Sequence, residues 1–219
     1  MMNEILKDLN KALDSVSEFY YSMPTVVLEN DNLDVEEDEI KYYERRFVAQ
    51  IKSEYDKLIS NDETENYKDV NTDLEVIKKY IYSEPDNEIV ETYKKLNQKN
   101  EKKTFKSITT IPDFFIHKEQ DNKEKSFQKL VVEAKTAENI DETELFLDLF
   151  KLNVYAEKYN FQNCVFIITN NETNRVKQLS KKYLTSKLYL SPNNLKNIYL
   201  FIKPRFGEKT EVIRLIDLK

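Results

Sequence analysis

Two short apolar runs on either side of a long amphipathic segment place the strongest constraint on the fold. The runs cover residues 128–136 and 163–169, and polar clusters bound each of them, as is typical of strands. Residues 141–159 lie between them and carry apolar side chains at helical spacing, namely Leu145, Leu149, Leu152 and Ala156. The order strand, crossover helix, strand predicts an α/β domain with a mixed central β-sheet flanked by helices.

The remaining elements are predicted from the same features, helical spacing of apolar residues for helices and short apolar runs for strands. We expect helices at 5–20, 39–60, 69–82 and 172–184, and further strands at 89–96, 111–117, 187–190, 197–202 and 211–216. Residues 1–38 would form an N-terminal helical extension with an acidic loop, and residues 39–219 the main domain. The acidic stretch from Glu29 to Glu39 indicates a solvent-exposed loop.

The composition excludes several classes of protein. No apolar run approaches the roughly 18 residues of a membrane helix, and the first residues lack a signal peptide, so we expect a soluble cytoplasmic protein without a membrane partner. Cys164 is the single cysteine, which excludes an internal disulfide and a thiolate-rich zinc site. His117 is the single histidine, which excludes a multi-histidine zinc site.

The charge is distributed unevenly along the chain. The net charge is -6, but residues 1–93 carry 10 basic and 24 acidic side chains, whereas residues 171–219 carry 11 and 4. A second basic segment, residues 94–106, is rich in lysine and includes Lys102 and Lys103. These basic parts are candidates for contact with a phosphate backbone, and a solvated loop is the alternative for the lysine-rich segment.

Charged residues interrupt two of the predicted strands. Asp113 opens one strand, and Glu133 and Lys135 end another, where alternation puts both side chains on one face. Buried charges are costly unless they are paired or bind a metal. If the two strands form a hairpin, Asp113 and Glu133 can converge on one divalent cation, and oxygen ligands of this kind suit Mg²⁺.

The motif Pro112-Asp113, a spacer of nineteen residues, and Glu133-Ala134-Lys135 resembles the PD-(D/E)xK nuclease superfamily. The resemblance implies a restriction-endonuclease-like core and a DNA-cleaving activity that depends on Mg²⁺, for which Mn²⁺ can substitute. It also implies a glutamate on the preceding helix that coordinates metal or water. Glu44 matches best, with Glu39 and Glu54 as competitors and Glu91 as a weaker candidate.

The predicted helix after the motif carries a second polar group. Asp148, Lys151 and Tyr155 can share one side of it, as either an intrahelical salt bridge or a phosphate contact. Lys151 and Tyr155 resemble the Gln-x-x-x-Tyr element of the exonuclease-like branch, with lysine in place of glutamine. His117 has the strand parity of Asp113, and a hydrogen-bonded structural histidine is the simpler interpretation.

Two kinds of function are therefore open. The first is a metal-dependent nuclease acting on DNA in restriction, phage defence, repair or mobile-element processing. The second is a non-catalytic protein of the same fold that binds nucleic acid, a protein partner or a second copy of itself. An RNA nuclease or a mimic of nucleic acid is a third hypothesis.

Overall fold

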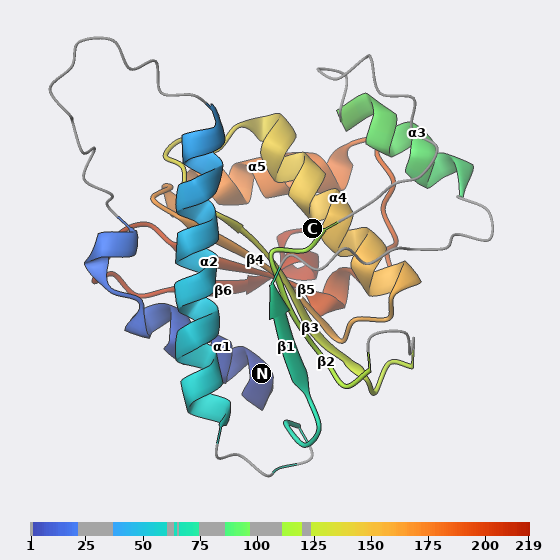
Figure 1. The fold of residues 1–219 in the computed structure, drawn as a ribbon. Helices are drawn as coiled ribbons and strands as arrows, with labels where there is room; N and C mark the ends of the chain where they lie inside the picture. Colours follow the sequence, from blue (N-terminus) through green and yellow to red (C-terminus); the bar gives the residue numbers. More distant parts are fainter. Residues whose placement is uncertain are drawn as a thin grey trace, which may run out of the picture.

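A six-stranded mixed sheet forms the centre of the protein (Figure 1). The computed structural model describes residues 2–21, 37–60, 64, 66–74, 86–96, 111–119 and 124–219, and for residues 37–43 the helical backbone only. The strands stand in chain order: β1 (Asn71–Leu74), β2 (Phe114–His117), β3 (Gln128–Lys135), β4 (Asn163–Thr169), β5 (Ile198–Lys203) and β6 (Glu211–Arg214).

The sheet combines an antiparallel half with a parallel half. Strands β1, β2 and β3 pair antiparallel, β3, β4 and β5 pair parallel, and β6 returns antiparallel to β5. The two parallel connections are made by helices α4 (Glu142–Lys158) and α5 (Thr173–Thr185). All seven residues of β4 are buried, as expected for a parallel strand covered on both faces. The predicted mixed α/β sheet is confirmed.

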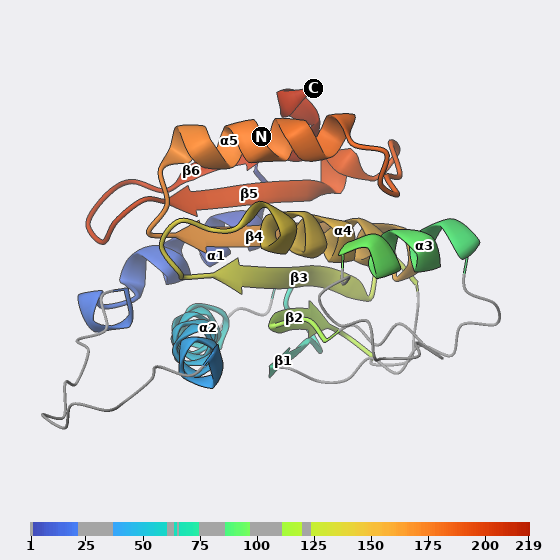
Figure 2. The same ribbon diagram turned by 90° about the horizontal axis from the view of Figure 1, so that it is seen from above.

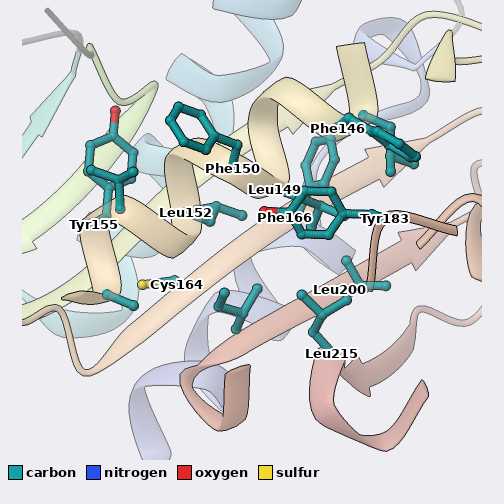
Figure 3. Close-up of a cluster of buried hydrophobic side chains, with 14 of the residues drawn as sticks. Phe146, Leu149, Phe150, Leu152, Tyr155, Cys164, Phe166, Tyr183, Leu200 and Leu215 are labelled. Atoms are coloured by element: carbon teal, nitrogen blue, oxygen red, sulfur yellow. The ribbon is translucent and has the colours of Figure 1, made fainter. Parts of the chain in front are cut away.

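Helices cover both faces of the sheet (Figure 1). On one face, α3 (Asn87–Leu96), α4 and α5 pack over the sheet, and Figure 3 shows Leu149 of α4 in this cluster with Phe166 of β4 and Leu200 of β5. On the other face, α1 (Glu4–Ser15) and α2 (Glu37–Ile59) form a second cluster with strand residues such as Val132. The sheet is therefore the middle layer of three.

The first helix belongs to this second cluster. Asn3 caps α1 by accepting a hydrogen bond from the Leu6 amide, and its side-chain nitrogen donates to Asn163 Oδ1 at 2.8 Å. The helix ends at Ser15, earlier than predicted, and a short 3-10 helix, η1 (Glu18–Tyr20), follows it. The buried side chains of α1 pack against α2 and the sheet.

Several other predicted elements are also wrong, wholly or in part. Residues 89–96 form helix α3 and not a strand. Residues 71–74 form β1 within the predicted helix 69–82, of which residues 75–82 lie outside the described part of the chain. Residues 187–190 form no strand, because Thr92 Oγ1 on α3 accepts the hydrogen bond of the Tyr189 amide at 2.9 Å in place of a strand partner.

Two further expectations concern a membrane span and the charged segments. Within the described residues, no helix is both long enough and apolar enough to span a membrane. Most of the acidic stretch 29–39, including the side chain of Glu39, falls outside the described part of the chain, as do Lys102 and Lys103.

Candidate active site at the ends of β2 and β3

The paired strands β2 and β3 bring the three motif residues together. Phe114 of β2 stands opposite Val132 of β3, so Asp113, just before β2, lies next to Glu133. Asp113 Oδ2 accepts a hydrogen bond from the Ala134 amide at 2.8 Å. This bond fixes the Asp113 carboxylate at the carboxyl end of β3.

The pleat of β3 assigns the motif side chains to the face covered by α4. Val131 belongs to the hydrophobic cluster under α4, whereas Val132 and Ala134 belong to the cluster under α1 and α2. Glu133 and Lys135 have the parity of Val131 and therefore face α4. The strand thus presents two charged side chains to the face of the sheet that α4 covers.

Helix α4 supplies the charges that meet them. Lys151 Nζ donates to Glu133 Oε2 at 3.2 Å and to Asp148 Oδ1 at 2.7 Å. Asp148 and Lys151 are three residues apart, the spacing that places two side chains on one face of a helix. The expected intrahelical salt bridge exists, and the same lysine also bridges to the strand.

Helix α2 contributes the last member. Lys135 Nζ donates to Glu44 Oε1 at 2.9 Å and lies 3.8 Å from Asp148 Oδ2. In Figure 2, α2 is seen nearly end-on, close to the arrowhead of β3. We call this group the carboxylate–lysine cluster; its members are Glu44, Asp113, Glu133, Asp148, Lys135 and Lys151.

The cluster is buried and has an excess of acidic groups. The side chains of Glu133 and Asp148 are 3% and 2% exposed, while those of Lys135 and Lys151 are 23% and 21% exposed. Glu133 Oε1 and Asp148 Oδ2 are buried without a hydrogen-bond partner among the described residues. Four carboxyl groups share two ammonium groups, so two negative charges remain uncompensated when all ionise.

Burial and the repulsion of neighbouring acids raise the pKa values of Glu44, Asp113 and Glu133. Burial raises the pKa of Glu44 to about 7, although Lys135 opposes this shift. Burial likewise raises the pKa of Asp113, and raises the pKa of Glu133 well above its ordinary value, with Asp113 and Asp148 adding to the effect. The two lysines therefore do not supply enough positive charge to keep these three acids fully ionised.

The two lysines are held in their charged form. Burial opposes the charge of Lys135 and Lys151, but the surrounding carboxylates outweigh it, and the pKa of each lysine is raised. For Lys151 the carboxylates responsible are Asp148, Glu133 and Asp113 in that order. Both ammonium groups therefore keep their charge at neutral pH.

The donor set fits a hard divalent cation, because it consists of carboxylate oxygens with two surplus negative charges, and two of the buried oxygens have no hydrogen-bond donor among the described residues. In the arrangement observed, no group of three or more His, Cys, Asp or Glu side chains in the described residues stands ready to hold a metal ion. Lys151 occupies the space between Glu133 and Asp148. Asp113, Glu133 and Glu44 could hold an ion after a local rearrangement of these side chains.

A cleft gives access to the Asp113 side of the cluster. It measures about 280 Å³ and is lined by Arg45, Val48, Ala49, Leu74 and Asp113. Its walls come from α2 and from the end of β1. A ligand in this cleft would reach Asp113 beside the basic side chain of Arg45.

Two of the competing glutamates, Glu54 and Glu91, lie elsewhere, and the side chain of Glu39 falls outside the described part of the chain. Glu54 Oε1 accepts hydrogen bonds from Gln50 at 2.6 Å and from Lys57 at 2.8 Å, within α2. Glu91 is exposed on α3 and pairs with Lys94 at 3.0 Å, so its predicted strand position is wrong. Glu44 is thus the candidate that the structure brings to the cluster.

Tyr155 and His117 have structural environments. Tyr155 is fully buried, with its ring 5.4 Å from that of Tyr159 and 6.3 Å from that of Phe161, so it offers no accessible surface to a nucleic acid. His117 Nε2 lies 2.7 Å from Asp73 Oδ2 on β1. This pair joins the first two strands.

Asp148 is the member of the cluster that sequence reasoning assigned only to a salt bridge. The sequence does indicate that Asp148 is buried, because it lies three residues after Leu145 and four before Leu152, on the apolar stripe of α4. A carboxylate on a buried stripe requires a partner or an ion.

Comparison of the chain with protein family models, with curated proteins and with solved structures finds no match. The chemistry of the carboxylate–lysine cluster is therefore the basis for inferring a function.

Proposed function

We propose that this protein is a Mg²⁺-dependent nuclease that hydrolyses phosphodiester bonds in DNA. The observation that carries the proposal is the carboxylate–lysine cluster, in which buried carboxylates outnumber the ammonium groups and Lys135 stands beside them. A buried acidic surplus is costly without a cation. A bound divalent ion would supply the missing positive charge and would account for the surplus of buried carboxylates.

The resemblance to PD-(D/E)xK nucleases supports the proposal through the order of elements. It implies an acidic residue on a helix, two hairpin strands with the motif, a helix and a buried strand. The chain has α2 with Glu44, strands β2 and β3, then α4 and β4 in that order.

Four members of the cluster have a task in the proposed hydrolysis. Asp113 and Glu133, with Glu44, would hold the ion, which when bound polarises the phosphate and lowers the pKa of a water. Lys135 would orient the attacking water and stabilise the negative charge that grows on the phosphate oxygens. The water oxygen bonds to phosphorus while the bond to the leaving oxygen breaks.

Where Asp113 and Glu133 hold the ion without Glu44, Glu44 is suited to accept the proton of the attacking water. A carboxyl group whose pKa is about 7 is half ionised at neutral pH, which is the condition under which a general base is most effective. Its contact with Lys135 at 2.9 Å places both groups on the same side of the cluster.

DNA is proposed as the substrate because the basic segments can neutralise a phosphate backbone. Residues 171–219 carry 11 basic and 4 acidic side chains. Arg45 at the cleft beside Asp113 adds a basic group close to the cluster. Binding that depends on such contacts weakens steeply with salt.

A non-catalytic binding protein is the second candidate, and one observation favours it. Lys151 already pairs with Glu133 at 3.2 Å and with Asp148 at 2.7 Å, so part of the cluster is neutralised without a metal. In that case the protein would bind a nucleic acid or protein partner and leave phosphodiester bonds intact.

The test is cleavage of labelled DNA and RNA by the purified protein with Mg²⁺ or Mn²⁺. We expect DNA cleavage that EDTA abolishes and that Lys135→Ala and Asp113→Ala each lower by roughly 100-fold or more. Lys158→Ala is the control, because it also removes a lysine, from the end of α4, where Lys158 pairs with Asp86 at 3.7 Å outside the cluster. Equal cleavage by all four proteins would exclude the assigned site. A folded protein that neither cleaves nor binds divalent metal in calorimetry would favour the second candidate.

A further inference from the structure

Lys151 lies inside the carboxylate–lysine cluster, among its acids. Its ammonium donates to Asp148 at 2.7 Å and to Glu133 at 3.2 Å, one acid on its own helix and one on β3. Among the described residues, these are the two least exposed carboxylates of the cluster. A single cation therefore joins the buried acids of the sheet and the helix.

The remaining oxygens of the same two acids are poorly satisfied. Glu133 Oε1 and Asp148 Oδ2 are buried, and among the described residues neither accepts a hydrogen bond. A carboxylate that is turned toward one ammonium leaves its second oxygen without a hydrogen-bond donor, which is unfavourable for a buried group. A divalent ion can bind oxygens of both carboxylates and complete its shell with water, and it brings two positive charges where the ammonium brings one.

We propose that Lys151 holds the place of a divalent cation in the metal-free protein, and that Asp148 is a further ligand of that cation. This inference rests on the proposed nuclease function. The ammonium and a divalent ion repel each other and compete for the same oxygens, so Lys151 leaves when the ion binds. The lysine stem is long, and its side chain is 21% exposed, so the charged end has a route to solvent.

The displaced ammonium then becomes available to the substrate. A phosphate of bound DNA offers Lys151 a new anionic partner beside the cluster, which lowers the cost of leaving Glu133 and Asp148. DNA therefore strengthens metal binding, and the metal strengthens DNA binding by the same factor. Lys151 couples the two ligands without contacting the metal.

The experiment measures Mn²⁺ affinity by calorimetry and thermal unfolding without metal, both in the absence of DNA. The variants are Lys151→Met, with Lys151→Gln as a second replacement, and Lys135→Met as the matched control that removes one positive charge from the same cluster. We expect Lys151→Met to unfold at a lower temperature than the wild type without metal. It should bind Mn²⁺ roughly tenfold tighter or more, and gain clearly more than Lys135→Met.

The outcomes separate this inference from the proposed function. Binding of Mn²⁺ by the wild type with no gain in Lys151→Met and Lys151→Gln overturns the inference and leaves the nuclease proposal intact. An equal gain in Lys135→Met also overturns it, because the effect is then one of net charge and not of occupancy. Absence of Mn²⁺ binding in the wild type and all variants overturns both proposals.

Discussion

The carboxyl group of Glu44 should make the stability of the metal-free protein fall as pH rises through neutrality. Glu44 lies between α2 and the end of β3, where its side chain is 16% exposed and pairs with Lys135. Replacing it with glutamine keeps the shape of the protonated acid and removes its ionisation. The Glu44→Gln variant should therefore lose this part of the pH dependence.

The magnitude follows from the two protonation equilibria. Burial raises the pKa of Glu44 to about 7, whereas its ordinary value is 4.5. Between these values the folded protein binds more protons than the unfolded chain, so the free energy of unfolding decreases with rising pH. The stabilising contribution is fully present below about pH 4.5 and is lost through about pH 7, a total of about 3 kcal/mol.

Urea unfolding in EDTA, followed by circular dichroism from about pH 5 to about pH 8.5, measures this change. The wild type should lose stability across the range, and Asp113 and Glu133 add to the loss because their pKa values are also raised by burial. The free energy of unfolding of Glu44→Gln relative to the wild type should rise by about 2.5 kcal/mol over this pH range.

Glu54→Gln is the matched control, because Glu54 lies on the same helix and pairs with Lys57 outside the cluster. It should follow the wild-type curve. If Glu44→Gln also follows the wild-type curve, the carboxyl of Glu44 ionises as an ordinary acid and the reasoning from burial is refuted. Under the proposed function, saturating Mg²⁺ should flatten the wild-type curve, because the ion stabilises the ionised acids.

Substitutions at three further positions test the packing and the turns by urea unfolding. Leu149→Ala empties a fully buried position under α4 and should cost about 2–5 kcal/mol; a loss below 1 kcal/mol would contradict its place in the core. Asn170 donates to the carbonyls of Tyr21 and Thr136, both at 2.9 Å, at a φ of 57°, so Asn170→Gly should cost about 2 kcal/mol and Asn170→Ala about 1 kcal/mol more. Equal losses would show that the backbone conformation adds nothing. Gly207→Ala should cost about 1–2 kcal/mol through its φ of 80° alone, since no atom lies within 4 Å of the added carbon. An unchanged stability would mean that the turn adopts another conformation.

The elements that follow the motif could be predicted from local pattern. Residues 163–169 form β4 with the predicted limits, and β3 and α4 differ from prediction by one or two residues at their ends. Long periodic segments and a fully apolar run leave little freedom to the chain, because one face or both must be buried.

Residues 89–96 show where local pattern is insufficient. Ile89, Val90 and Tyr93 favour a strand by their branched and aromatic side chains, but Ile89 and Leu96 also lie seven residues apart, on one side of a helix. Both are buried in the cluster that α3 forms with α4. Contact with a neighbouring helix, which no local pattern encodes, selected the helical period.

The sequence by itself determined the α/β class and the common face of Glu133 and Lys135, because strand alternation and apolar periodicity act between near neighbours in the chain. Only the tertiary structure decided that Glu44 meets Lys135 across 91 positions and that Lys151 bridges Asp148 to Glu133. The physical reason is that electrostatic and desolvation energies depend on distance in space and on burial, which exist only after the helices pack against the sheet.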